Sequence, residues 1–320
     1  MNNVFKKEER YTFAILLVIL LVALALRVAG AWISYPLITH PDEPALVGRA
    51  ARIVSTGNLN PEFFNYPSLV IYIQVAVRYA LVAATKVFYG AGAASIPEVN
   101  FYVAGRIVAS VAATLSVLMV YLTARRLFSV SAGLFAAAVV AVCPLHVDNS
   151  AMVTVDIWVA VFAAFVLYFC AKIYEKGEFN DYILAGACVG LATGSKYTGA
   201  VFFIGIVAAH FMRHATLRGA LLDVKKPALA ALATAAYFIA TTPYALLDFK
   251  RFLAHVAYES RHYRRGHSGY SAEGNHSWDL YADFLLSDAG LGIVFLVLAL
   301  ASVVLVLRSI RTGGGIVPFS

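Results

Sequence analysis

Residues 11–44 read YTFAILLVILLVALALRVAGAWISYPLITHPDEP, and this stretch contains the two features that decide the fold. The part from Tyr11 to Ile33 is apolar and long enough to cross a bilayer, since a spanning helix needs about 20 such residues. Asp42 and Glu43 follow with a proline on each side, and these prolines restrict the backbone that presents the two carboxylates. The sequence predicts a membrane anchor followed by an acidic pair at the membrane surface.

A helix N-terminus is the simpler interpretation of the acidic pair. Asp42 would cap the helix and Glu43 would lie in its first turn, where carboxylates satisfy free N–H groups and suit the helix dipole. Apolar residues recur at helical spacing as far as Thr56, and Gly57 is typical of a helix end. An amphipathic helix with arginines on its polar side fits the membrane interface. Both interpretations of the pair stay open at this point.

The composition of the chain is that of a polytopic membrane protein. Of the 320 residues, 61% are hydrophobic and 13% are charged, whereas soluble domains carry about 25% charged residues. The net charge of +7 then reflects basic cytoplasmic loops and argues against a nucleic-acid partner. The three cysteines lie in apolar runs without the spacing of a metal site.

We expect an all-α membrane bundle with about eight spans and both termini in the cytoplasm. The run 68–88 is long enough to cross, but Gln74, Arg78 and Lys86 interrupt it. If it crossed, the basic segments that follow would lie outside, against the positive-inside rule, so we assign it to an interfacial helix. The predicted spans are 11–33, 101–122, 131–147, 151–172, two short crossings within 182–212, 227–247 and 290–307.

These spans form one integral-membrane domain over residues 1–320. The first extracytoplasmic loop, residues 34–100, then holds the interfacial helices. A second extracytoplasmic loop, residues 248–289, is too long for a plain connector.

Ionisable residues at membrane depth are further candidates, because they are costly in lipid and by default point to function. Asp156 lies near the outer end of a span, where a bond to a neighbouring helix is the alternative explanation. His146 and Asp148 lie at a helix junction, where capping explains them equally well. Lys196 lies at the expected break between the two short crossings, where exposed backbone would line a polar cavity.

The second long loop adds basic groups to the candidates. Arg264 and Arg265 suit a phosphate, because guanidinium groups match phosphate oxygens, although attraction to anionic lipid headgroups is an alternative. His262 and His267 do not have a recognised metal-ligand spacing. No cofactor is certain, and a divalent metal stays an open alternative.

Five segments in this order resemble the GT-C membrane glycosyltransferases. The similarity is greatest to the branch of protein O-mannosyltransferases and lipid A aminoarabinose transferases, and it covers approximately residues 11–300. The segments are the first span, HPDEPALVGRAARIVSTGNLNPEFFNYPSLVIYIQ (40–74), AGRIVASVAATLSVLMVYLTARRLF (104–128), VTVDIWVAVF (153–162) and GLATGSKYTG (190–199).

The resemblance implies a transferase that uses a polyprenyl-phosphate-linked sugar donor at the extracytoplasmic face of the plasma membrane. The acceptor would be a lipid, a glycan or a protein, and direct displacement would invert the anomeric centre. Asp42 matches the acidic residue of the family's first outer loop, Asp156 its second acidic residue and Lys196 its cavity lysine. Asp42 is then the expected base with Glu43 orienting it, while Lys196 and the loop arginines would hold the donor phosphate.

The segment around Tyr66 departs from the family. Asn65-Tyr66-Pro67 stands where the aminoarabinose branch has Glu-Lys-Pro, so both charges are missing here. Family members continue through further spans, which implies a fragment or a reduced form of the fold. The candidates for substrate contact are Tyr66, His146, Asp148, His262 and His267.

Two other functions stay open. A transporter or lipid-carrier flippase would use Asp156 and Lys196 as pathway residues, although the repeated halves of transporters are not found. A noncatalytic fragment that only binds the lipid carrier is the other alternative.

Overall fold

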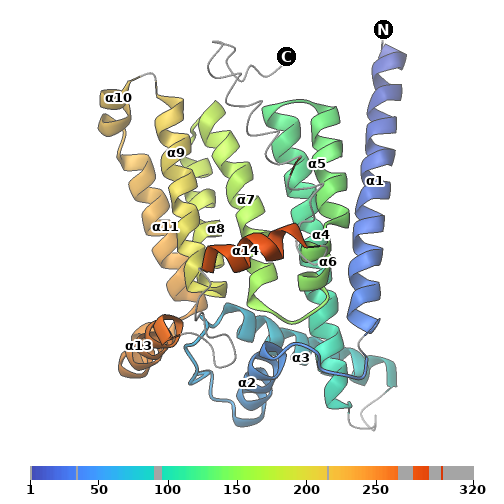
Figure 1. The fold of residues 1–320 in the computed structure, drawn as a ribbon, viewed down its shortest axis with the longest axis vertical. Helices are drawn as coiled ribbons and strands as arrows, with labels where there is room; N and C mark the ends of the chain where they lie inside the picture. The colour runs from blue at the N-terminus through green and yellow to red at the C-terminus, as the bar shows by residue number, and fades with distance from the viewer. Residues whose placement is uncertain are drawn as a thin grey trace.

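The protein is a helical bundle in which further helices lie across one end, as Figure 1 shows for a computed structural model. The structure describes residues 2–33, 35–89, 96–214, 216–265, 277–287 and 297, and all regular secondary structure within these ranges is helical. The predicted all-α class is confirmed.

Several helices are long and apolar enough to span a membrane, including one that the sequence assigns to the interface. By length and composition, Glu9–Ile33, Leu69–Tyr89, Glu98–Leu127 and Val155–Glu175 could each cross a membrane. The helices Val130–Val142 and Pro144–Ser150 form a fifth span if the 59° bend between them is included. The other bundle helices are shorter, and the run 290–307 lies outside the described residues except at position 297, so about eight crossings stays a prediction. The bundle contains α1 (Asn2–Ile33), α4 (Glu98–Leu127), α5 (Val130–Val142), α6 (Pro144–Ser150), α7 (Val155–Glu175), α8 (Phe179–Ser195), α9 (Phe203–Arg213) and α11 (Lys225–Thr241), and α10 (Leu217–Leu222) joins the last two.

Glycines let α8 and α11 approach closely. A Cβ atom on Gly186 would lie 2.1 Å from the carbonyl oxygen of Ala230, and one on Gly190 would lie 2.5 Å from that of Thr234. The Thr234 hydroxyl donates to the Gly186 carbonyl at 3.0 Å. Small residues and hydroxyl bonds of this kind are typical of helix pairs within membranes.

The predicted break after α8 is present at Lys196. α8 ends at Ser195, Lys196 is extended with φ −149° and ψ 135°, and the short helix η1 (Tyr197–Phe202) leads into α9. The chain therefore reverses direction at this lysine. This turn is at the end of the bundle across which further helices lie (Figure 1).

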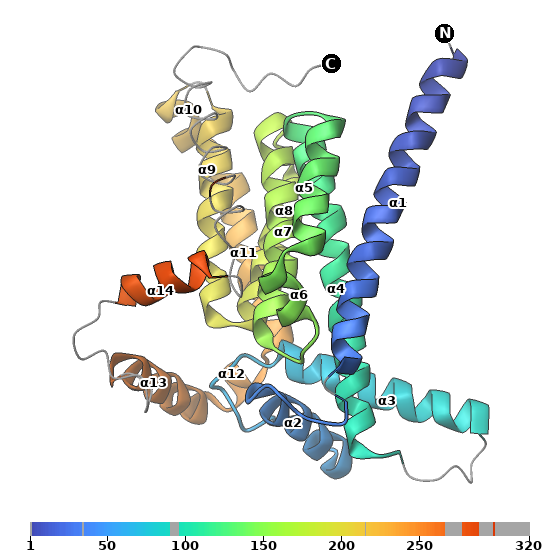
Figure 2. The same cartoon turned by 45° about the vertical axis from the view of Figure 1, so that its right-hand side comes forward.

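α2 (Asp42–Thr56) and α3 (Leu69–Tyr89) lie across this end of the bundle. α2 has the predicted bounds, and Gly57 ends it with φ 71° while its N–H bonds the Ile53 carbonyl at 2.9 Å. Figure 2 shows α3 running at a steep angle to α4. Its length and composition would also allow it to cross a membrane, so its position at the interface stays a prediction.

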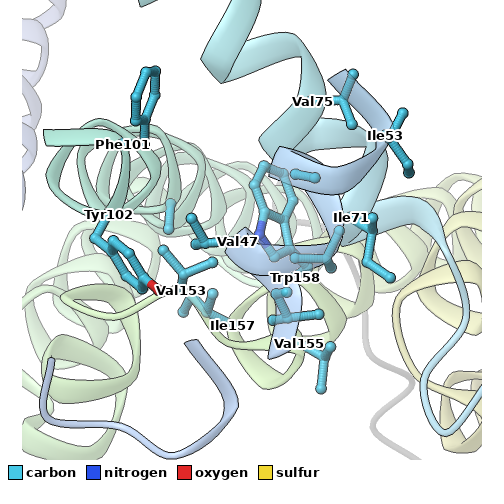
Figure 3. Close-up of a cluster of buried hydrophobic side chains, with 14 of the residues drawn as sticks. Val47, Ile53, Ile71, Val75, Phe101, Tyr102, Val153, Val155, Ile157 and Trp158 are labelled. Atoms are coloured by element: carbon cyan, nitrogen blue, oxygen red, sulfur yellow. The ribbon is translucent and has the colours of Figure 1, made fainter. Parts of the chain in front are cut away.

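The apolar face of α2 packs on protein. Val47 and Ile53 are each 1% exposed and join a cluster with Ile71 of α3 and Trp158 of α7 (Figure 3). Burial of such side chains contributes about 1.5–3 kcal/mol each. The amphipathic pattern that suggests contact with lipid therefore marks a helix that is buried against α3 and α7.

The second long loop contains helices that its polar composition conceals. α13 (Phe249–Arg265) and α14 (Ser277–Leu286) account for most of residues 248–289 that the structure describes, and the short helix α12 (Tyr244–Leu247) directly precedes them. α13 is amphipathic and lies at the same end of the bundle as α2 (Figure 1). The segment predicted as a long loop is therefore helical over α13 and α14.

The basic turns lie at the opposite end of the bundle, which predicts the orientation in the membrane. Arg125, Lys172 and Arg213 are near the ends of α4, α7 and α9 that point away from α2 (Figure 2). In a variant without native cysteines, we expect Ser55→Cys to react with an impermeant maleimide in intact cells, since basic ends stay in the cytoplasm. Glu178→Cys should react only after permeabilisation, and the reverse pattern would invert the orientation.

Candidate active site

Asp42 is the first residue of α2, and its carboxylate faces the loop that follows this helix. Pro41 occupies the N-cap position without a side-chain cap bond, so the capping interpretation of Asp42 is wrong. Instead, the Tyr66 hydroxyl donates to Asp42 Oδ2 at 3.0 Å. Both side chains are partly exposed. The structure therefore brings together a carboxylate and a phenol that are 24 residues apart.

Glu43 lies beside Asp42 but belongs to a buried ion pair. Its oxygens accept from Arg106 Nε at 2.8 Å and Arg106 Nη2 at 2.7 Å, and one also accepts from the Val153 N–H at 2.9 Å. Arg106 and Glu43 are 1% and 0% exposed. This two-pronged bond is the strong form of a carboxylate–guanidinium contact. Glu43 thereby joins the start of α2 to α4 and to the segment before α7.

Sequence reasoning missed Arg106 as a functional candidate. It stands in the middle of an apolar run, and the rule that selected Asp156, that an ionisable residue at membrane depth points to function, applies to it equally. Its counter-ion cannot be found from the sequence, because Glu43 is 63 positions away.

Asp156 lies in the first turn of α7, nearer the helix start than expected. Its Oδ1 accepts from Lys196 Nζ at 2.7 Å, and the side chains are 50% and 28% exposed. An ion pair so accessible stabilises the fold by about 0–1 kcal/mol. The pair is therefore open to exchange with a charged ligand. Because Glu43 bonds Val153, three residues before Asp156, the two acidic segments are also neighbours.

A cleft of about 470 Å³ extends from Asp156 between α6 and α7. Most of its wall is apolar, and His146, Asn149 and Asp156 supply the polar groups. A pocket with this lining suits a ligand that is mainly apolar and has a few polar atoms. The residues around it are Cys143, Leu145, His146, Asn149, Asp156, Ile157 and Ala160.

Arg27 of α1 holds His146 in the wall of this cleft. Pro144 has no N–H, so the Val140 carbonyl at the end of α5 lacks its helical donor, and Arg27 Nη2 donates to it at 3.1 Å. The same nitrogen donates to His146 Nδ1 at 2.8 Å. The other ring nitrogen of His146 then donates to the Ser116 hydroxyl at 3.1 Å, which fixes a neutral ring.

The remaining candidates belong to α6 and α13 or lie outside the described residues. Asp148 is exposed on α6. His262, Arg264 and Arg265 stand near the C-terminal end of α13, and His267 lies outside the described residues. Within the described ranges, no group of three or more His, Cys, Asp or Glu side chains could hold a metal ion.

Comparisons with known proteins agree with this architecture. Residues 99–244 match the family model of dolichyl-phosphate-mannose-protein mannosyltransferase, a segment that includes Arg106, Asp156 and Lys196. No curated protein matches the chain.

Solved structures share the fold at low sequence identity. The Saccharomyces cerevisiae protein O-mannosyltransferase Pmt1-Pmt2 complex bound to the sugar donor matches with a TM-score of 0.52 and 19% identity, over 78% of this chain and 33% of that chain. The Archaeoglobus fulgidus oligosaccharyltransferase AglB, in complex with an inhibitory peptide and a dolichol-phosphate, matches with a TM-score of 0.52 and 17% identity, over 95% of this chain and 37% of that one.

A second structure of the Archaeoglobus fulgidus oligosaccharyltransferase, tethered to an acceptor peptide, has a TM-score of 0.54 and 18% identity. It matches over 95% of this chain and 38% of its own. This chain therefore spans between 33% and 38% of the length of these solved chains. The chain has the fold of the GT-C membrane glycosyltransferases, and over residues 99–244 it resembles the protein O-mannosyltransferases in sequence.

Proposed function

We propose that this chain carries the catalytic end of a membrane glycosyltransferase that moves a sugar from a polyprenyl phosphate to an acceptor at the extracytoplasmic face. The observation that carries the proposal is the placement of Asp42–Tyr66 and Asp156–Lys196 at one end of the bundle, linked through Glu43. Asp42 offers a base and Lys196 a cation for this reaction, and an apolar cleft lies beside Asp156. The ligand classes come from the relatives, whose structures hold a sugar donor or a dolichol-phosphate.

Asp42 is the group that we assign to the acceptor proton. The Tyr66 hydroxyl holds Asp42 Oδ2, which orients the carboxylate and leaves Oδ1 for the acceptor hydroxyl. As the proton moves to Asp42, the acceptor oxygen forms a bond to the anomeric carbon and the bond from that carbon to the phosphate oxygen breaks. The electron pair stays on the phosphate, and a single displacement inverts the anomeric centre.

Lys196 is the cation that we assign to the departing phosphate. Before the donor binds, Asp156 holds the ammonium group in place at 2.7 Å. A phosphate can take over this contact because the ion pair is exposed and contributes little to stability. Charge grows on the phosphate during transfer, so a fixed ammonium group stabilises the transition state more than the ground state. The apolar wall beside Asp156 suits the isoprenoid part of the donor.

Lys196→Met tests this assignment through donor binding. We expect donor affinity to fall about tenfold, which corresponds to about 1.4 kcal/mol, and transfer to slow as well. Lys196→Arg should recover part of the loss, because a planar fork does not reproduce a point charge. Donor titration in detergent measures the effect.

Lys250→Met is the matched control for this titration, since Lys250 is an exposed lysine on α13. Its donor affinity should equal that of the parent. If Lys196→Met also binds the donor as the parent does, Lys196 is not part of the donor site.

A further inference from the structure

Phe64 lies in the loop between α2 and α3, and distant side chains hold both polar groups of its backbone. Its side chain is 0% exposed. Its N–H donates to His255 Nδ1 of α13 at 3.1 Å, and its carbonyl accepts from the Tyr197 hydroxyl of η1 at 2.9 Å. A buried peptide outside regular structure needs such partners, because an unsatisfied group costs about 1–3 kcal/mol.

Phe64 lies between the two sides of the site. Tyr197 directly follows Lys196, whereas Tyr66, two residues after Phe64, bonds Asp42. The Phe64 peptide is therefore a short connection between the residue next to the cation and the loop that holds the carboxylate.

Aromatic packing surrounds the same peptide. The ring of Phe252 lies 5.7 Å from that of Phe64 and 6.2 Å from that of Tyr197, both edge to face. The His255 ring lies 5.9 Å from Phe64. Such contacts favour a defined angle between the rings, so they restrict how far the loop can turn.

Polar contacts from Asp248 and from α13 hold the loop on both sides of Phe64. Asn60 donates to Asp248 Oδ2 at 2.8 Å, and Arg251 lies 3.4 Å from Glu62. On the other side, the Asn65 amide donates to Glu259. The segment around α13 therefore fixes the loop over several residues.

We infer that Tyr197 and His255 are positioning residues, which set the geometry of Asp42 relative to Lys196 through the Phe64 peptide. Neither residue needs to touch the substrate for this role. The inference rests on the proposed function for its catalytic part, and its structural part can be measured separately. α13 contributes to the site in the same way, because its packing on the loop keeps the Asp42 carboxylate and the Lys196 ammonium group in their relative positions.

Hydrogen exchange of the peptide spanning residues 60–67 tests the structural part without any activity. His255→Leu removes the acceptor for the Phe64 N–H, and we expect exchange of that amide to rise about fivefold or more. His255→Asn should restore protection, because its side-chain oxygen can replace Nδ1. Unchanged exchange in His255→Leu would show that His255 does not hold the Phe64 peptide, whether or not the protein is a transferase.

A double-mutant cycle tests the catalytic part. Tyr197→Phe should lower kcat about tenfold while the donor Kd stays within about twofold, since a small displacement of reacting groups costs rate before affinity. In a Tyr66→Phe background the same change should cost less than about twofold, because the connection to Asp42 is already lost. Tyr79→Phe, an exposed tyrosine on α3, is the matched control.

Two results would overturn the positioning role. One is equal loss from Tyr197→Phe in both backgrounds, because the hydroxyl would then act independently of Tyr66. The other is a His255→Leu variant in which exchange at Phe64 is raised but kcat is unchanged. If the parent chain shows no transfer at all, the proposed function fails. The exchange measurement still tests whether His255 holds the Phe64 peptide.

Discussion

Asp42→Asn is expected to lower the rate of sugar transfer by about 100-fold or more, the usual contribution of a general base. The amide keeps the size of the side chain and can still accept the bond from the Tyr66 hydroxyl, so the local geometry is preserved. It cannot accept the proton of the acceptor hydroxyl. Turnover with saturating donor and acceptor measures the effect, and gel filtration in detergent checks that the variant is folded.

Asp283→Asn is the matched control for this change. Asp283 is an exposed aspartate on α14, and its replacement should leave turnover within about twofold of the parent. Tyr66→Phe should have an intermediate effect of about tenfold, because it removes one bond that orients the base. Full turnover in Asp42→Asn would exclude Asp42 as the base.

Arg106→Met is expected to have the largest effect on stability, about 3–5 kcal/mol. Glu43 would then remain as a buried carboxylate whose charge is no longer balanced, while the Val153 N–H stays bonded to it. The loss should lower the apparent melting temperature in detergent by several degrees. Glu62→Gln is the matched control, since Glu62 is 38% exposed and its pairs with Arg52 and Arg251 are both accessible to solvent, so their loss should cost about 1 kcal/mol or less.

The double variant Arg106→Met with Glu43→Met separates pairing from packing. Replacing both partners by apolar side chains of similar size is often neutral, so the double variant should be more stable than Arg106→Met alone. A double variant that loses the sum of both single effects would show that the charges do not act as a pair. The same double variant should still lose transfer, because the link from α2 to Val153 is absent.

Local signals in the sequence were sufficient for several elements that form the site. α2 has its predicted bounds because apolar spacing defines its face and Gly57 supplies the positive φ that ends it. The break at Lys196 was predictable because the apolar run was too short for two crossings. The positive-inside rule assigned α3 to the interface, and the helix lies at a steep angle to α4 (Figure 2), although its position in a membrane stays a prediction.

Contacts between distant segments were outside the reach of sequence reasoning. The partner of Glu43 is Arg106 and the partner of His146 is Arg27, and in both cases a bundle helix brings the residues together over more than 60 positions. The sequence marked such groups as costly in lipid but did not identify what neutralises them. α13 was missed for a different reason: its polar face dominates the composition, and its apolar face covers a loop and not a membrane span.

The assignment of the donor phosphate to Arg264 and Arg265 stays a prediction. Both residues lie in α13, whose earlier part packs on the loop around Phe64. Basic residues near that end of the helix are compatible with a second cation for the phosphate.

Transfer of label from a polyprenyl-phosphate sugar is the measurement that tests the central claim most directly. Membranes that contain the chain would be supplied from the outer face with a panel of donors carrying labelled sugars, and the products would be separated and their anomeric configuration determined. We predict a labelled product that depends on the chain, has the inverted configuration and falls by about 100-fold or more in Asp42→Asn. Equal label in membranes with and without the chain, or full product from Asp42→Asn, would contradict the account.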